Sequence, residues 1–347
     1  MAECTFRDGH TIRDFGQPYF VAEVNTSHYG KMETAKEMIN AAVSIGCNCV
    51  KFQSWSAESL YSKTYFDENP FAKRMVSRFS FSEEHLKELA GYCKEKKISF
   101  ASTPYSEKEV DFLTEVCNVP YIKIASMDLD NHRFLKYIAE KRVPIVLSTG
   151  MSTMEEIERA VKFLKQEGVC ELCLLHCISV YPPERKDIHL NNILGLRERY
   201  PDIPIGFSDH SIGSEMSIAA VAMGAALIEK HLTLDSKKIG MDNQMAMEPE
   251  DMQRMIKSCN HVYEAAGERE RILSEAELNQ KIKMRRSIIA AVDIKKGTVL
   301  KEEMLGAKRP ATGIPLEKMD QLIGSTVNRD IQADTIIYPE DVNWDCE

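Results

Sequence analysis

The sequence contains no run of about 18 consecutive apolar residues, the length that a membrane-spanning helix requires. Its first residues, MAECTFRDGHTIRDFG, are charged and lack the apolar core of a signal peptide. Basic residues are fewer than acidic ones, 44 against 53, and the net charge of −9 argues against a nucleic-acid-binding protein. We therefore expect a cytoplasmic protein that does not bind nucleic acid or a membrane.

The cysteines do not form the pattern of a zinc ribbon. Cys170 and Cys173 make one C-x-x-C pair, but no second pair lies at the required spacing. In a reducing compartment we expect free thiols that are mostly buried, with a redox or metal role for this pair as the alternative. The ten cysteines are Cys4, Cys47, Cys49, Cys93, Cys117, Cys170, Cys173, Cys177, Cys259 and Cys346.

One pattern recurs from residue 19 to residue 267: a short apolar run, a loop and a helical stretch. In TMEEIERAVKFLKQEG, for example, Ile157, Val161 and Leu164 fall on one helix face. Thr153 and Glu156 fit a capping box that begins this helix. The eight predicted strands are Tyr19–Val24, Cys47–Gln53, Ile98–Thr103, Tyr121–Ser126, Pro144–Ser148, Leu172–Cys177, Ile203–Ser208 and Ala226–His231.

Eight apolar strands that alternate with helices predict a parallel sheet covered by helices. Eight such units over about 250 residues are typical of a (β/α)8 TIM barrel. A doubly wound open sheet is the alternative, but no glycine-rich turn follows the first strand. Beyond the last helical pattern, short strand-like runs predict a small, mostly β domain. We expect a barrel over 1–275, a linker over 276–285 and the small domain over 286–347.

Polar side chains stand at the end of every predicted strand. In a (β/α)8 barrel this edge carries the functional residues, so their convergence favours an active site over eight separate satisfied polar groups. The residues that this rule selects are Glu23, Lys51, Gln53, Thr103, Lys123, Ser126, Ser148, Thr149, His176, Tyr181, Ser208, Asp209, His210, Glu229, Lys230 and His231.

These side chains fall into chemical groups. The lysines and hydroxyls among them suit a phosphate. His210 and His231 lie on adjacent strands and either bind a divalent metal or are hydrogen-bonded structural histidines. Glu23 is a candidate general acid or base, and His28 either orients the substrate or is exposed.

A series of short motifs runs in order along nearly the whole chain. In the barrel they are AEVNTSHYG, VKFQ, STP, KIAS, LSTGM, LHCISVYP, GFSDHS, EKHLTLD and GMD, and in the C-terminal part RRSIIAAVDIKKG and KRPATGI. The barrel motifs resemble those of the sialic acid synthase family, and the C-terminal segments resemble the antifreeze-like (SAF) domain of that family.

The resemblance implies that phosphoenolpyruvate condenses with an N-acylated aldohexose, such as N-acetylmannosamine, and water, with release of phosphate. It implies a divalent cation, Mn²⁺ with Mg²⁺ or Co²⁺ as alternatives, that is held by His210 and His231, and a catalytic role for Glu23. It further implies a domain-swapped homodimer in which Arg309 reaches the partner's site. Phosphoenolpyruvate would be bound by Lys51, Thr103, Lys123, Ser126, Ser148 and Ser208, and the sugar by Gln53, Tyr181, Asp242 and Arg309.

Three positions depart from the family's usual residues: Ser27, Asp128 and Ser179. They leave open a legionaminic or pseudaminic acid synthase that uses a 2,4-diacetamido-2,4,6-trideoxyhexose. A related synthase with an aldose phosphate acceptor would need a second phosphate site, for which the sequence offers few basic residues. A non-catalytic carbohydrate-binding protein would be expected to have damaged strand ends, whereas here they are intact.

Overall fold

The structure is a computed structural model that describes residues 2–343. It divides between Gly267 and Glu268 into two compact units. Cys346, one of the ten expected thiols, lies outside the described residues, as do the last positions of the predicted small domain. The other nine cysteines are free thiols, as expected.

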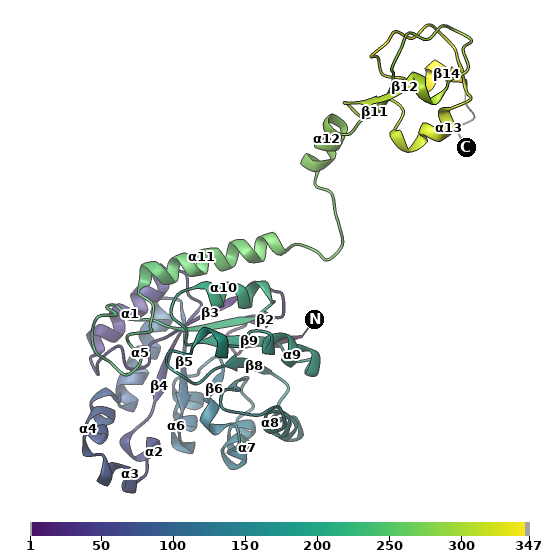
Figure 1. Ribbon diagram of the computed structural model, residues 1–347. Coiled ribbons are helices and arrows are strands. Elements are labelled where there is room, and N and C mark those ends of the chain that lie inside the picture. The colour runs from purple at the N-terminus through teal and green to yellow at the C-terminus, as the bar shows by residue number, and fades with distance from the viewer. Residues whose placement is uncertain (1, 344–347) are drawn as a thin grey trace. The chain divides into compact units, whose positions relative to one another are not determined.

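The first unit contains the predicted parallel barrel (Figure 1). Its strands are hydrogen-bonded in the order β5-β4-β3-β10-β9-β8-β7-β6, and β5 and β6 are neighbours at the remaining seam. All eight predicted strands are confirmed. They are β3 (Tyr19–Glu23), β4 (Cys49–Ser54), β5 (Ser99–Pro104), β6 (Ile122–Ile124), β7 (Ile145–Ser148), β8 (Leu172–Cys177), β9 (Ile205–Asp209) and β10 (Leu227–His231).

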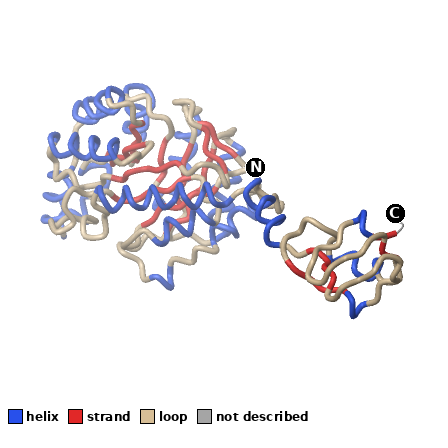
Figure 2. Tube along the Cα trace, turned by 90° about the horizontal axis from the view of Figure 1, so that it is seen from above, coloured by secondary structure: helices blue, strands red, loops and turns tan. Residues whose placement is uncertain are grey.

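Helices surround the barrel strands, drawn blue around red in Figure 2. Three short helices, which the sequence analysis does not predict, are inserted after β4: α2 (Ala57–Leu60), α3 (Lys63–Glu68) and α4 (Pro70–Phe79). The covering helices are α1 (Met32–Ser44), α5 (Glu83–Glu95), α6 (Glu107–Asp111), α7 (His132–Glu140), α8 (Met154–Gln166), α9 (Asn192–Arg199), α10 (Glu215–Ala222) and α11 (Pro249–Ala266). The expected capping box of Thr153 and Glu156 begins α8.

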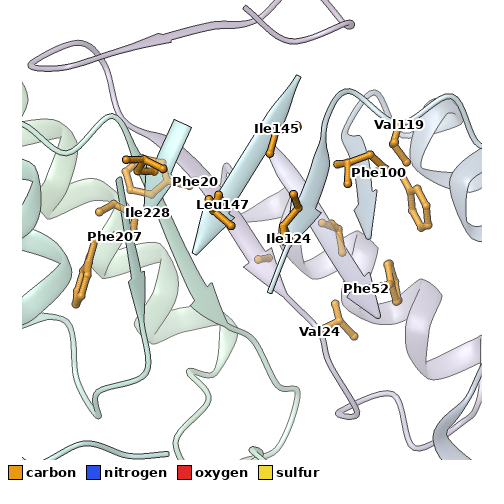
Figure 3. Close-up of a cluster of buried hydrophobic side chains, with 14 of the residues drawn as sticks. Phe20, Val24, Phe52, Phe100, Val119, Ile124, Ile145, Leu147, Phe207 and Ile228 are labelled. Carbon is orange, nitrogen blue, oxygen red and sulfur yellow. The ribbon is translucent and has the colours of Figure 1, made fainter. Parts of the chain in front are cut away.

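Successive side chains of each strand point in opposite directions, toward the surrounding helices and toward the barrel interior, so the strands are buried on both faces. Phe20, Phe52, Ile124, Leu147 and Phe207 belong to the outer layer, which packs against the helices (Figure 3). The alternate positions face the barrel interior and form a second apolar cluster, of which Tyr19, Val21, Cys49, Ala101, Tyr121, Val146, Cys173, Leu175 and Leu227 are strand-borne members. Positions two residues further along each strand continue the inward face toward the carboxyl ends.

A short antiparallel hairpin closes the amino-terminal end of the barrel. It consists of β1 (Glu3–Thr5) and β2 (Thr11–Arg13), and its buried Cys4, Phe6 and Ile12 join the inner cluster. The sequence analysis did not predict this hairpin. Since it fills this end with apolar side chains, polar groups of the interior gather at the other end.

The second unit contains the predicted short strands, which form two two-stranded antiparallel sheets, but helices and loops make up more of it than the mostly β prediction expected; its core includes Ile288, Leu300, Ile314 and Ile337. Its elements are α12 (Glu275–Met284), β11 (Ser287–Ala290), β12 (Leu305–Lys308), α13 (Met319–Leu322), β13 (Thr326–Val327) and β14 (Val342–Asn343). Among residues 2–343, no helix combines the length and apolar character needed to cross a membrane.

Candidate active site

A cavity of about 250 Å³ lies at the carboxyl ends of the barrel strands. It collects every residue to which the family resemblance assigns a role except Arg309, which lies in the second unit. The roles of these residues stay predictions, but their convergence follows from the alternation of the strands. The residues brought together are Glu23, Lys51, Gln53, Thr103, Lys123, Ser126, Ser148, Tyr181, Ser208, His210, His231 and Asp242.

Two buried lysines and their hydroxyl partners form the cationic part of the cavity. Lys51 Nζ lies 3.2 Å from Thr103 Oγ1, and Lys123 Nζ lies 2.6 Å from Ser148 Oγ. Burial lowers the pKa of Lys123, whereas for Lys51 two carboxylates outweigh burial and raise the pKa. An ammonium and a hydroxyl donor side by side are the donor set that a phosphate or carboxylate accepts.

Two buried carboxylates, Glu23 and Glu229, share these lysines but titrate differently. Lys51 contacts Glu23 directly and lies 3.7 Å from Glu229, while Lys123 lies 3.9 Å from Glu229. Burial raises the pKa of Glu23, with the Lys51 charge only partly opposing it. For Glu229 the two lysines outweigh burial and hold the pKa below its usual value. Two neighbouring carboxylates whose pKa values are shifted in opposite directions are typical of acid–base sites. Glu23, with the raised pKa, is the one of the two that can carry a proton.

His210 and His231 face each other across the cavity mouth with ring centroids 5.5 Å apart. The Nδ1 atom of His210 lies 2.8 Å from the carbonyl oxygen of Ile178, which can only accept, so this nitrogen carries the proton and Nε2 points its lone pair elsewhere. Burial lowers the pKa of His231 well below its usual value, which keeps this imidazole neutral. For His210, the neighbouring Cys177, the Ile178 carbonyl and Glu229 outweigh burial and raise the pKa.

The donor set near the two histidines fits a divalent cation with open positions. Within residues 2–343, no group of three or more His, Cys, Asp or Glu side chains is arranged to hold a metal. The histidine pair would therefore bind an ion only together with water or substrate oxygens, as in catalytic metal sites. Oε2 of Glu23 pairs with Lys51 Nζ, whereas Oε2 of Glu229, 3.7 Å from the same ammonium group, has no hydrogen-bond partner.

The outer part of the cavity carries hydrogen-bonding and apolar groups. Gln53 donates to Glu23 Oε1 over 3.2 Å and accepts from the Tyr105 hydroxyl over 2.6 Å. The ring of Tyr181 packs on His210 with centroids 4.2 Å apart. Asp242 accepts a hydrogen bond from the Asn25 amide, and burial raises the pKa of this carboxyl. Such a mixture suits a neutral polyhydroxylated ligand.

A close approach of two loops explains Gly150 in the LSTGM motif. A Cβ atom at this position would collide with the hydroxyls of Ser126 and Ser179. The Gly150 amide donates instead to Ser126 Oγ over 3.0 Å, which fixes this hydroxyl at the cavity wall.

Several residues selected by the strand-end rule point away from the cavity. Thr149 donates to the Leu175 carbonyl over 2.9 Å, and His176 lies 2.6 Å from the Ile188 carbonyl. Asp209 and Lys230 form a buried ion pair behind the strands, 2.8 Å between Nζ and Oδ2. These four side chains bind other parts of the protein rather than lining the cavity.

His28 is buried rather than exposed and is not among the residues that line the cavity. Its ring stacks on Phe81 at 4.1 Å, and its Nδ1 accepts from the Gly30 amide over 2.9 Å. Burial lowers the pKa of His28 from 6.5 to about 3. The folded protein therefore leaves this ring neutral at a pH at which the unfolded chain already binds a proton.

This difference predicts a pH-dependent loss of stability. The contribution of neutral His28 to the free energy of unfolding is complete above pH 6.5. It is lost as the pH falls toward about 3, by about 1.4 kcal/mol per pH unit. His28→Asn keeps an acceptor for the Gly30 amide but cannot titrate, so it should have a shallower slope over this range. Urea unfolding followed by circular dichroism at several pH values measures both slopes, and equal slopes would contradict the assignment.

The C-x-x-C pair does not form a metal site. Cys173 points into the barrel interior, whereas Cys170 is exposed in the loop before β8. Burial raises the pKa of Cys173 well above its usual value, so the thiol stays protonated. The structural interpretation of this pair is the one that the geometry supports.

Several residues that line the cavity have no role assigned from the sequence. Glu229 is selected by the strand-end rule without a role, and Ser179 is known only as a departure from the family pattern. Asn25, Ala125, Cys177 and Met151 stand inside the quoted motifs. Tyr105 and Met127 lie beyond strand ends, Met127 in a short 3-10 helix (Ser126–Asp128), where strand periodicity carries no signal.

The barrel and its polar cavity define a (β/α)8 enzyme. The profile of the NeuB family matches residues 38–271, and that of the SAF domain matches residues 285–343. The chain therefore belongs to the NeuB family and carries a C-terminal SAF domain, which confirms the resemblance to sialic acid synthases.

Similar proteins are named as synthases of N-acetylneuraminate 9-phosphate, N-acetylneuraminic acid or N,N'-diacetyllegionaminic acid. The chain is 33% identical over 330 residues to the N,N'-diacetyllegionaminic acid synthase of Campylobacter jejuni, covering 91% of this chain and 98% of that protein. It is 32% identical over 331 residues to human N-acetylneuraminate-9-phosphate synthase, covering 93% and 92%. The crystal structure of the N-acetylneuraminic acid synthetase of Leptospira borgpetersenii in complex with citrate superposes with a TM-score of 0.74 at 31% identity, covering 80% and 94%.

Proposed function

We propose that the protein is a nonulosonic acid synthase. It condenses phosphoenolpyruvate with an open-chain N-acylated aldohexose such as N-acetylmannosamine and with water, and it releases phosphate to give N-acetylneuraminic acid or a close relative. The observation that carries this proposal is one cavity in which Lys51 and Lys123 face the His210–His231 pair. The family's synthases at about a third identity support the reaction class.

The lysine side suits phosphoenolpyruvate. Its phosphate and carboxylate would accept from Lys51, Lys123 and the neighbouring hydroxyls, and would displace Glu229 from its contacts with both ammonium groups. Because the cavity also contains Glu23 and Glu229, two lysines alone do not balance an anionic substrate. A divalent cation at His210 and His231 would supply the missing positive charge. We propose Mn²⁺ as this ion, with Mg²⁺ or Co²⁺ as alternatives.

The chemistry follows from this arrangement. A bound cation supplies Lewis acidity at the aldehyde oxygen of the open-chain sugar. C3 of phosphoenolpyruvate then forms the new carbon–carbon bond, and positive charge develops at C2. Water adds to C2, and the tetrahedral product loses phosphate with cleavage of the C2–O bond. Glu23, held by Lys51 and by the Asn25 amide over 2.8 Å, stabilises the developing charge or accepts the proton of the water.

Two apolar side chains at the mouth favour a second candidate acceptor. Met127 and Met151 line the cavity and are 55% and 69% exposed. Their thioethers suit the methyl group and the additional acetamido group of a 2,4-diacetamido-2,4,6-trideoxyhexose, the acceptor of a legionaminic or pseudaminic acid synthase. An aldose phosphate fits less well, because Lys51 and Lys123 are the only basic lysine or arginine side chains among the described lining residues.

Phosphate release tests the proposal. Purified protein would be incubated with phosphoenolpyruvate and Mn²⁺ across N-acetylated hexoses, a hexose phosphate and 2,4-diacetamido-2,4,6-trideoxy sugars. Acceptor-dependent release with one neutral sugar supports a synthase and identifies its acceptor. Binding of these sugars without release of phosphate would support the carbohydrate-binding alternative instead.

Arg309 is proposed to contact the sugar from the partner subunit of a domain-swapped homodimer, as the family resemblance implies. We expect Arg309→Ala to raise KM for the acceptor about tenfold or more, the effect of losing one charged hydrogen bond. KM for phosphoenolpyruvate should stay near that of the unchanged protein, since Lys51 and Lys123 lie in the barrel. Initial rates measure both constants, with the exposed neighbour Lys308→Ala as the control. A parallel rise of both constants would contradict a sugar-specific role.

A further inference from the structure

The carboxyl ends of β9 and β10 carry a second cation–carboxylate system on the side opposite the cavity. Lys230 and Asp209 are directly paired in the register of the two strands. Their side chains are 2% and 0% exposed. His210 follows Asp209 and His231 follows Lys230, so each partner of this ion pair is the neighbour in sequence of one cavity histidine.

The Asp209 carboxylate is fully occupied by donors from several elements. Its Oδ1 accepts from the amide and the hydroxyl of Ser211, at 2.8 and 2.6 Å. Its Oδ2 accepts from Ser217 on α10 at 2.6 Å and from Lys230 on β10 at 2.8 Å. The system is therefore closed, in contrast to Glu229 in the cavity, whose Oε2 has no hydrogen-bond partner. A closed system has no capacity left for a ligand.

Lys230 also holds the residue on the other side of His210. Its Nζ donates to the Ser211 carbonyl over 2.5 Å, in addition to its bond with Asp209. One ammonium group thus fixes both chain neighbours of His210, while its own backbone leads directly into His231. Since adjacent side chains of a strand point to opposite faces, the groups that Lys230 fixes lie behind the strands and both histidines lie in front.

We propose that Lys230, through Asp209 and Ser211, is a positioning residue that sets the separation of His210 and His231 for a shared divalent cation. The inference rests on the proposed function, because it presupposes a cation at this pair. A buried ion pair is seldom more stabilising than apolar side chains of the same volume, so fold stability alone does not account for it. Metal affinity, in contrast, depends steeply on how precisely the ligands are held.

A second buried ion pair, next to the amino end of β9, serves as a matched control. Asp14 accepts from the amide of Ile205, the first residue of β9, and pairs with Arg197 at 3.0 Å. This pair is also largely buried, with side chains 5% and 16% exposed. Arg197→Met therefore removes an ion pair that adjoins the amino end of β9 without touching the neighbours of either histidine.

The test measures Mn²⁺ and phosphoenolpyruvate binding separately in the full-length protein. Free Mn²⁺ is titrated by electron paramagnetic resonance, and phosphoenolpyruvate binding is measured by calorimetry without metal. Lys230→Met should weaken Mn²⁺ binding by about tenfold or more and leave phosphoenolpyruvate binding at Lys51 and Lys123 unchanged. Arg197→Met should leave Mn²⁺ affinity within about twofold of the unchanged protein, since distant sites act independently.

Two further variants keep the outcome decisive. If Lys230→Met does not fold, Lys230→Gln retains a donor to Ser211 without the charge and should still weaken Mn²⁺ binding measurably. An unchanged Mn²⁺ affinity in the folded lysine variant, with a loss in His231→Ala, would overturn the positioning role alone. An Mn²⁺ affinity that His231→Ala does not alter would instead remove the proposed metal site, and the positioning role with it.

Discussion

Replacing His231 by alanine is expected to abolish Mn²⁺-dependent condensation. The loss of a Lewis acid is worth several kcal/mol, so kcat/KM should fall on the order of 1000-fold or more. The physical reason is the small ligand set: with His231 removed, only His210 remains of the two imidazoles that face each other at 5.5 Å. Rates of phosphate release over a range of Mn²⁺ concentrations, together with direct Mn²⁺ binding, measure the effect.

His261→Ala is the matched control for this change. It removes the same imidazole from the exposed face of α11, so rates and Mn²⁺ affinity should equal those of the unchanged protein. Binding of phosphoenolpyruvate to His231→Ala should persist, because the lysines and hydroxyls of the cavity are untouched. Near-normal turnover with unchanged Mn²⁺ affinity would refute a metal role for this histidine.

The barrel could be predicted from the sequence because its strands are buried on both faces. Runs such as Leu172–Cys177 read as continuous apolar segments, and eight of them alternate with helical patterns. The hairpin of β1 and β2 gave no such signal, since Cys4, Phe6 and Ile12 are single apolar residues among polar ones. Only their contact with the barrel interior makes them part of a core.

The candidate site shows the limit of the strand-end rule. The rule gives the edge of the sheet but not the face, and a shift of one residue exchanges the two faces. Ser208 and Glu229 therefore point into the cavity while Asp209 and Lys230, one position later, point away from it. With strand registers known, alternation alone would have separated these two sets.

Residues beyond the strands could not be placed by periodicity. Tyr105 lines the cavity from the loop after β5, and Met127 from the short 3-10 helix Ser126–Asp128. Asp242 follows β10 by eleven positions and was selected only by the family resemblance; its contact with Asn25 depends on the fold of the intervening segment. The acceptor side is consequently the part of the cavity that the sequence predicts least.

Replacing Glu23 by glutamine should separate chemistry from substrate binding. Turnover is expected to fall about 100- to 10,000-fold, the range for losing a positioned acid–base group. The amide can still accept from the Asn25 backbone, so the shape of the site is retained. Phosphate release gives kcat and calorimetry gives the dissociation constant of phosphoenolpyruvate, with the exposed Glu264→Gln as the control.

The ion pair with Lys51 makes the binding measurement decisive. If Glu23 serves only to orient this lysine, glutamine should weaken phosphoenolpyruvate binding as strongly as it slows turnover. If Glu23 acts on the charge that develops at C2, binding should be unchanged or tighter, because a negative charge beside the anionic substrate has been removed. Unchanged phosphoenolpyruvate binding would also fit Glu23 as the base for the attacking water, and burial raises the pKa of Glu23 in the direction that suits a proton acceptor.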